Sequence, residues 1–167
     1  MVLCVNRKNM IREIKKYPEP ILRKKAEEVE EITPEIKQLA QDLIETILKS
    51  EQEAVGLAAP QVGISKRMFA AQTAEGPRVF LNPKIINKSG REVTEEGCLS
   101  LPKIWIKVKR AKKVEIKALD IDGKKIKTKA EGIFARILQH EIDHLNGILI
   151  IDKVNFWRKL KRTLKGV

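Results

Sequence analysis

The sequence predicts an α+β fold in which antiparallel sheets pack around a central helix within one compact domain. Three observations support this class. Apolar residues follow helical spacing in only a few segments, whereas alternating segments with hairpin signals fill the middle of the chain. Helices and strands do not alternate regularly, which argues against a parallel sheet. A chain of 167 residues with 43% hydrophobic residues can bury one core, so residues 10–167 are interpreted as a single domain.

The N-terminal part contains an unpatterned segment, an arm and a helix. Residues 1–9 show no periodicity and are interpreted as a disordered extension or an alternative start. Residues 11–29 mix charged residues with prolines and are expected to form an extended arm over the body of the protein. Thr33 as N-cap and Pro34 at the first helical position begin a helix predicted to run to about Gln52.

The segment from Ala54 to Gly63 is apolar, rich in small residues and broken by glycine and proline. This composition is typical of a loop whose backbone comes close to another group. Its one polar side chain is that of Gln61. A tight structural turn would have the same composition, so the segment alone indicates only close backbone packing.

The middle of the chain is predicted to supply the antiparallel strands. Short strands are expected near residues 67–73 and 78–81, and residues 95–102 form a second irregular segment in which glycine and proline flank a cysteine. Apolar and polar residues then alternate over 104–108 and 114–118, as in half-buried strands.

The C-terminal third is predicted to contain the central helix. An Asp-Gly pair at 122–123 signals a hairpin turn before it. The helix is expected from about residue 131 to 145, and an Asn-Gly pair at 146–147 ends it. Residues 148–151 are interpreted as a buried strand and residues 152–167 as a basic C-terminal helix.

The predicted central helix carries both histidines of the chain, in the pattern His140-Glu141-x-x-His144. Residues i and i+4 of a helix lie one turn apart on one face, so the two imidazoles can bind one metal ion. Glu141 can then reach a water molecule on that ion and act as general base. The alternative is a helix with two surface histidines and no metal. We interpret the domain as a catalytic metallohydrolase built on this helix.

A catalytic metal ion usually has three protein ligands and an open position for water. The chain has no third histidine and no glutamate after Glu141. Asp143 is expected on another face of the helix, and Asp152 is a poor second choice. Cys98 is the best remaining candidate because a thiolate binds metal strongly. A buried structural cysteine is the alternative.

Composition restricts the class of protein and its surroundings. Two cysteines cannot form a disulfide framework, and no apolar run approaches the ~20 residues of a membrane span, so a cytoplasmic protein without membrane contact is expected. The net charge of +12 attracts polyanions such as RNA, but it equally fits a solvated lysine- and glutamate-rich surface.

Three segments together resemble the three signature motifs of the peptide deformylase family. They are Ala54-Val55-Gly56-Leu57-Ala58-Ala59-Pro60-Gln61, Glu96-Gly97-Cys98-Leu99-Ser100 and Gln139-His140-Glu141-Ile142-Asp143-His144, in the family's order and at compatible spacing. The resemblance extends from about Met10 to Asp152. It implies hydrolysis of the N-terminal formyl group from the formyl-methionine of nascent polypeptides, with release of formate.

The resemblance also implies residue roles. Glu141 would take the proton from the attacking water, the side-chain amide of Gln61 and the backbone N–H of Leu99 would face the developing oxyanion, and Gly56 would bind the substrate backbone. Fe²⁺ is the expected metal ion, with Zn²⁺, Ni²⁺ or Co²⁺ able to occupy the site. The implied metal ligands are Cys98, His140 and His144.

The central helix is also expected to contribute to substrate specificity. Ile133, Ile137 and His140 follow one another at helical spacing, so an apolar strip runs towards the ligands. With Val55 and Leu57 it is expected to line a pocket for methionine, although plain core packing explains these residues equally well.

Two positions depart from the usual family pattern. Ala54 stands where glycine usually opens the first motif, and Trp105 falls near a rim position that often carries arginine or an aromatic residue. Trp105 is equally well explained as a strand residue that covers the core.

Two other functions compete with this reading. A general metallopeptidase would need a different third ligand, and an RNA- or ribosome-binding protein with a structural metal would need a fourth. The expected partners are formyl-Met nascent peptides and the ribosome surface, through the basic charge and the C-terminal helix. No sequence-specific nucleic acid binding is expected.

Overall fold

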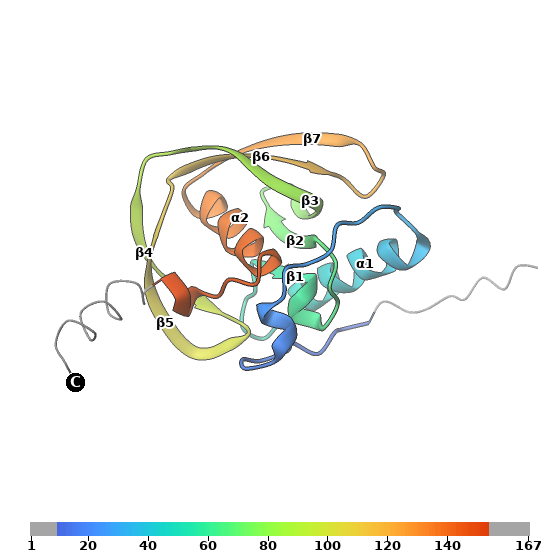
Figure 1. Ribbon diagram of the computed structural model, residues 1–167, viewed down its shortest axis with the longest axis horizontal. Coiled ribbons are helices and arrows are strands. Elements are labelled where there is room, and N and C mark those ends of the chain that lie inside the picture. Colours follow the sequence, from blue (N-terminus) through green and yellow to red (C-terminus); the bar gives the residue numbers. More distant parts are fainter. Residues whose placement is uncertain (1–9, 154–167) are drawn as a thin grey trace, which may run out of the picture.

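The helix α2 (Gly132–Leu145) lies between two antiparallel sheets in a computed structural model that describes residues 10–153 (Figure 1). The larger sheet has the strand order β1-β2-β3-β6-β7, and the smaller one pairs β4 with β5. This arrangement confirms the predicted α+β class with antiparallel sheets around a central helix. The strands are β1 (Gly56–Ala58), β2 (Met68–Thr73), β3 (Gly76–Ser89), β4 (Glu92–Cys98), β5 (Leu101–Arg110), β6 (Lys113–Leu119) and β7 (Lys125–Glu131).

Two helices cover opposite faces of the larger sheet at β2. Side chains alternate between the faces of a strand, and every residue from Met68 to Ala71 is fully buried because both faces are covered. Phe69 packs in the cluster that includes the buried face of α2, whereas Met68 packs in the cluster that contains α1 (Pro34–Leu48). The sheet therefore holds α2 from one side while α1 supports the sheet from the other.

The C-terminal end of α2 is held by a buried guanidinium. Arg67 donates to the carbonyl of Leu145, to Oδ1 of Asn146 at 2.9 Å and to the carbonyl of Pro83 at 3.2 Å. The N–H of Ala26 also donates to the Leu145 carbonyl, at 2.9 Å. A cation and an N–H at this end satisfy carbonyls that the helix leaves free and complement its dipole.

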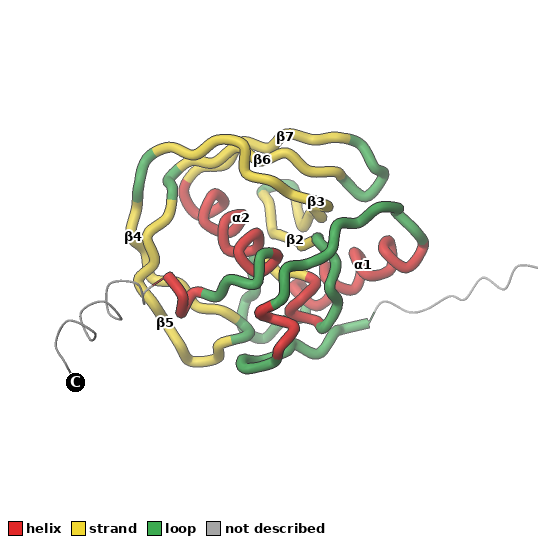
Figure 2. The backbone as a smooth tube through the Cα atoms, in the orientation of Figure 1, coloured by secondary structure: helices red, strands yellow, loops and turns green. Residues whose placement is uncertain are grey.

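The N-terminal arm crosses the front of the molecule as a nearly continuous loop, interrupted by the 3₁₀ turn η1 (Pro20–Arg23) (Figure 2). Its first described residues are tied to α1, because Asp42 accepts from the N–H of Met10 at 3.0 Å and from Nε of Arg12 at 2.8 Å. The N–H of Arg12 donates to Oγ1 of Thr46 at 2.9 Å. The arm predicted from the sequence is therefore present and anchored.

Several predicted boundaries were wrong. The helix α1 ends at Leu48 rather than near Gln52, and the strand predicted at 78–81 extends over the whole of β3. The segment 95–102, in which a turn was expected around Cys98, contains the end of β4, a turn at residues 99–100 and the start of β5. The segment 54–63 was predicted to be a loop, but it forms β1 followed by the 3₁₀ turn η2 (Ala59–Val62).

The buried strand predicted at residues 148–151 is also wrong. Residues 150–153 are helical, and Oδ2 of Asp152 accepts the N–H of Leu149 at 2.8 Å. A side-chain acceptor at this position caps a helical turn, which a four-residue apolar run cannot reveal. The predicted extension at 1–9 and the helix beyond residue 153 lie outside the described residues. Between residues 10 and 153, no helix is long and apolar enough to cross a membrane.

Candidate metal centre

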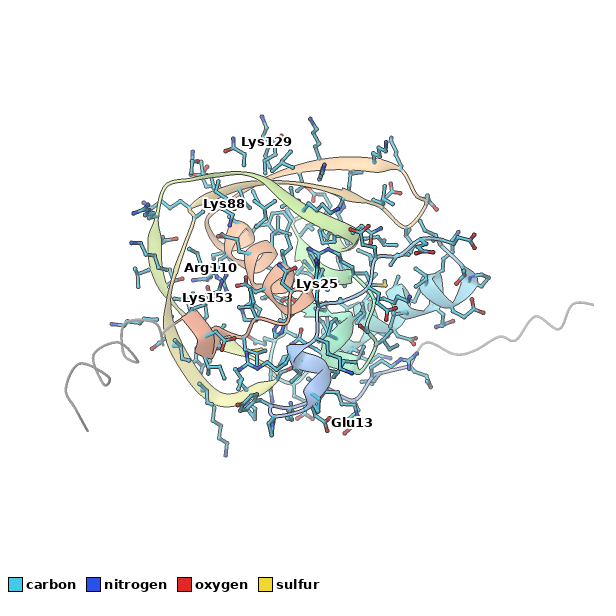
Figure 3. The ribbon with its side chains drawn as sticks, viewed as in Figure 1. Glu13, Lys25, Lys88, Arg110, Lys129 and Lys153 are labelled. Atoms are coloured by element: carbon cyan, nitrogen blue, oxygen red, sulfur yellow. The ribbon has the colours of Figure 1, made fainter. Side chains whose placement is uncertain are left out.

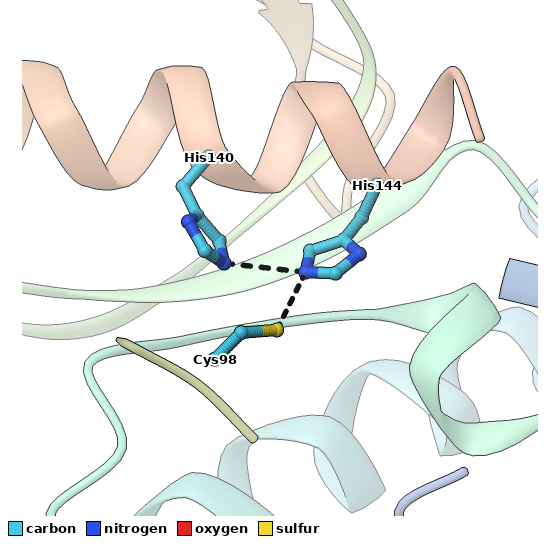
Figure 4. A group of neighbouring side chains, drawn as sticks. All are labelled: Cys98, His140 and His144. Carbon is cyan, nitrogen blue, oxygen red and sulfur yellow. Dashed lines mark hydrogen bonds between the residues drawn. The ribbon is translucent and has the colours of Figure 1, made fainter. Parts of the chain in front are cut away.

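The two histidines of α2 and the cysteine at the end of β4 bring three ligand atoms together (Figure 4). Nε2 of His140 lies 3.2 Å from Nε2 of His144, and Sγ of Cys98 lies 3.2 Å from the same nitrogen of His144. All three atoms lie within 4.8 Å of one another. The structure thus places together the three residues that the sequence proposed as ligands.

The spacing of these atoms fits a single metal ion. Metal–ligand bonds of about 2.0–2.3 Å in tetrahedral geometry place the ligand atoms about 3.3–3.6 Å apart, close to the observed separations. The two aspartates considered as alternatives are engaged elsewhere. Asp143 pairs with Arg110 at 2.7 Å, and Asp152 pairs with Arg23. One thiolate and two imidazoles form a donor set that suits divalent iron, cobalt, nickel or zinc.

A buried ion pair orients His140. Arg110 donates to both oxygens of Glu96, at 2.6 and 2.8 Å, and Oε2 of Glu96 lies 3.0 Å from Nδ1 of His140. Arg110 also pairs with Asp143, which in turn pairs with Lys153 at 2.9 Å beside α2 (Figure 3). A carboxylate on Nδ1 places the proton there and leaves Nε2 free to bind metal.

Glu96 is held in its ionised form. Burial alone would raise its pKa, but the hydrogen bonds from Arg110 and His140 outweigh burial and lower the pKa to about 2. The sequence analysis did not identify Glu96 or Arg110 as functional residues. Glu96 lies two positions before Cys98 in the same motif, which was a usable signal, whereas Arg110 meets Glu96 only through folding.

Glu141 is buried beside the ligands without a partner for all of its carboxylate. It is 4% exposed, and its Oε2 has no hydrogen-bond partner among the described residues. Burial raises its pKa to about 7, against the opposing effect of the positive charges of His140 and Arg110. A carboxylate in this state can accept and release a proton near neutral pH.

Two hydrogen-bond donors lie next to Cys98. Oε1 of Gln61 accepts the N–H of Ala58 at 2.9 Å, so the amide nitrogen is turned towards Oγ of Ser100 at 3.2 Å and Sγ of Cys98 at 3.7 Å. Gln61 is 2% exposed, which fixes this orientation. Between residues 10 and 153, no acceptor pairs with the N–H of Leu99. The Gln61 amide thus points at Cys98 and Ser100, with its longer contact to the cysteine sulfur.

A cavity of about 620 Å³ opens onto these groups. The predicted pocket residues Val55 and Ile137 line it, but Leu57 does not. Leu57 is fully buried in the core cluster around α1, so its predicted place in the pocket is wrong. Ile133 is 67% exposed and lies outside the lining, so its role stays a prediction. The site residues that line the cavity are Gly56, Gln61, Cys98, Leu99, His140 and Glu141, and Ala54, Trp105 and Arg136 also contribute.

Comparison with known proteins agrees with the motifs. The family described as polypeptide deformylase matches residues 11–160. The chain is 48% identical over 156 residues to a peptide deformylase of Dictyoglomus thermophilum, covering 93% of this chain and 97% of that protein.

Solved structures of peptide deformylases are similar to this structure as well. The crystal structure of peptide deformylase from Thermotoga maritima has a TM-score of 0.83 at 40% identity, covering 87% of this chain and 99% of that one. A Met-Ala-Ser-bound class I type b peptide deformylase from Acinetobacter baumannii has a TM-score of 0.80 at 35% identity, covering 88% and 100%.

We predict that Cys98→Ser strongly weakens metal binding, because a hydroxyl is a poor substitute for a thiolate. Residues that only orient ligands contribute about 10- to 100-fold to metal affinity, so loss of a direct ligand should exceed that. Metal affinity is measured by competition with a chelator. Cys4→Ser is the matched control and should retain wild-type affinity; the reverse result would exclude Cys98 as a ligand.

Proposed function

Because the chain belongs to the polypeptide deformylase family, we propose that Cys98, His140 and His144 hold its catalytic metal ion and that Glu141 moves the proton. The enzyme removes the N-terminal formyl group from nascent polypeptides in a metal-dependent hydrolysis that releases formate. The observation that carries the residue assignment is the convergence of three ligand atoms beside a buried, incompletely paired carboxylate.

The proposed metal ion is Fe²⁺, and Zn²⁺, Ni²⁺ and Co²⁺ suit the same donor set. A divalent ion at this position supplies a Lewis acid and makes water a competent nucleophile near neutral pH. Glu96 and Arg110 keep the ring of His140 in the orientation that the ligand set needs.

Glu141 takes the proton from the attacking water as the new C–O bond forms. The carbonyl electrons move to the formyl oxygen, which becomes an oxyanion. The oxyanion then re-forms the C=O bond as the C–N bond breaks, and Glu141 returns the proton to the amine. The second proton of the water remains on the formic acid, which ionises to formate. Burial raises the pKa of Glu141 and so makes its carboxylate a stronger base than an exposed glutamate, which suits proton transfer from water.

Gln61 and Leu99 stabilise the oxyanion. The amide nitrogen of Gln61 lies 3.7 Å from Sγ of Cys98, and Leu99 follows Cys98 in the chain. Gln61 donates to the oxyanion in place of this long contact with sulfur and keeps its bond to Ser100. Removal of one such donor from other enzymes costs about 3 kcal/mol in the transition state, so the pair contributes substantially to the rate.

The substrate peptide is proposed to lie along β1. In the part of the chain described, β1 pairs with β2 alone, so its other edge is open to an added strand. A Cβ at Gly56 would lie 2.5 Å from Oε1 of Glu141, so glycine allows the strand to approach the proton-transfer group. The Acinetobacter relative is bound to Met-Ala-Ser, which supports a short peptide as the ligand of this chain.

Nascent chains are proposed to meet the enzyme in the cytoplasm, at the ribosome surface. The net charge of +12 supports attraction to ribosomal RNA without sequence-specific contacts. The residues of the C-terminal helix that were expected to contribute lie outside the described part.

Glu141→Gln should lower kcat by about 10²- to 10⁴-fold, because the neutral amide keeps the size of the side chain but cannot accept the proton. The metal content should remain that of the wild type. Steady-state rates on formyl-Met-Ala-Ser are measured together with metal analysis of the same sample. Metal loss as the main defect would instead show that Glu141 only supports the ligands.

Gly56→Ala should lower kcat/KM by about 10- to 100-fold, because the added methyl displaces the Glu141 carboxylate from its working position. Thermal unfolding should change little, since the displaced atoms are the end of one side chain. Ala54→Gly is the control: it alters the same cavity wall without meeting Glu141 and should stay close to the wild-type rate. Equal effects of the two substitutions would contradict the proposed contact.

Formyl-Met peptides should be preferred over formyl-Ala peptides by about 10- to 100-fold in kcat/KM, the range expected for filling an apolar pocket. Ile137 and Val55 line the cavity and supply apolar walls, to which the flexible thioether of methionine adapts. Tripeptides that differ only in the first residue are assayed anaerobically at fixed metal content. Equal rates would exclude the pocket, and cleavage of internal peptide bonds would favour a general metallopeptidase.

A further inference from the structure

Three consecutive residues of the N-terminal arm bind the two segments that carry the oxyanion donors. The N–H of Lys15 donates to the carbonyl of Gln61 at 2.7 Å, and the N–H of Tyr17 donates to the carbonyl of Ser100 at 2.9 Å. Between them, Nζ of Lys16 donates to the carbonyl of Leu99 at 2.7 Å. The arm therefore bridges the 3₁₀ turn η2 and the turn between β4 and β5.

The turn between β4 and β5 depends on these bonds for its orientation. The ladder pairs Cys98 with Leu101 and leaves the two turn residues, Leu99 and Ser100, outside it. The carbonyls of both are held by the arm. The Leu99 N–H belongs to the peptide group before Leu99 and the Leu99 carbonyl to the group after it. Holding the carbonyl therefore directs the N–H by restricting the φ and ψ torsions of Leu99, which join these two planar groups.

The arm itself is fixed at both ends. Asp42 and Thr46 of α1 hold Met10 and Arg12 before it, and Ala26 binds the end of α2 after it. The guanidinium of Arg23 also lies over the ring of Tyr17, 5.4 Å from its centroid, in a cation–π contact within the arm. Because the arm is anchored at both ends, it can hold the turn in one position, which an unanchored segment could not do.

We propose that Lys16 is a positioning residue of the oxyanion hole: its ammonium holds the Leu99 carbonyl so that the Leu99 N–H faces the cavity. Lys16 does not line the cavity and acts only through Leu99. Its bond is charge-assisted and, at 2.7 Å, short, although it lies at the exposed surface. This inference rests on the proposed role of Leu99 in the hydrolysis.

The neighbouring lysine provides a matched control. Nζ of Lys15 pairs with Glu13 at 2.9 Å, at the edge of the molecule where Figure 3 shows Glu13, and makes no contact with the turn. Lys16→Met and Lys15→Met remove the same charge from adjacent positions and keep the apolar stem. Any effect of net charge or of lost surface lysine is therefore shared by both variants.

The first experiment compares kinetic constants on formyl-Met-Ala-Ser with equal metal content. Lys16→Met should lower kcat by about 3- to 30-fold, less than loss of an oxyanion donor itself, with KM unchanged because Lys16 does not touch substrate. Lys16→Arg should recover most of the rate, since a guanidinium donates to the same carbonyl. Lys15→Met should match the wild type. A wild-type kcat in Lys16→Met, or the same loss in Lys15→Met, overturns the proposal.

A second measurement does not depend on activity. In zinc-loaded protein labelled with ¹⁵N-leucine, the amide resonance of Leu99 should shift and broaden in Lys16→Met and remain unchanged in Lys15→Met. An unchanged Leu99 resonance in Lys16→Met overturns the positioning role. If wild-type enzyme does not deformylate the peptide, the proposed function fails, while the resonance still decides whether Lys16 orients Leu99.

Discussion

The buried ion pair of Arg110 and Glu96 joins the smaller sheet to α2 through Asp143 and His140, and the metal centre lies at this junction. A two-stranded sheet is marginal by itself, so β4 and β5 need partners outside their own ladder. Arg110 supplies them in both directions, to Glu96 within the sheet and to Asp143 on the helix, and Glu96 reaches His140. A buried ion pair is weak evidence for stability. Here the pair links the strand that ends at Cys98 to the helix that carries the two histidines.

The same junction separates two carboxylates into different roles. Glu96 is paired on both oxygens and has a pKa of about 2, whereas Glu141 lacks a cationic partner in contact and has a pKa of about 7. When the environments of two neighbouring carboxyl groups shift their pKa values apart, the two groups generally have different roles in a hydrolytic site. The paired group fixes a ligand and the unpaired group carries the proton. The two residues are close to the same histidine, so their roles follow from their partners rather than from their positions along the chain.

Patterns within a single segment of the sequence predicted those features of the site that depend on that segment alone. Helical spacing alone placed His140 and His144 on one face, and elimination among the possible ligands identified Cys98. Glu96 and Arg110 were not identified because the β4–β5 ladder pairs them with Ile106 and Glu92 respectively. Their contact arises only in the folded sheet, and no single segment encodes it. Leu57 was assigned to the wrong side because 54–63 was interpreted as a loop; on a strand, neighbouring side chains point to opposite faces, which sends Leu57 into the core.

The catalytic groups come from segments far apart in the sequence, and short motifs cannot by themselves set the distances between them. Gln61 belongs to η2, Leu99 to the turn after β4 and Glu141 to α2. The arm meets all three regions, since it binds the carbonyls of Gln61, Leu99 and Ser100 and then the carbonyl that ends α2. Sequence reasoning described this segment only as an extended cover, because its function lies in backbone and lysine donors that carry no periodic pattern. Its contacts connect the segments of both oxyanion donors with the end of the helix that carries two of the metal ligands.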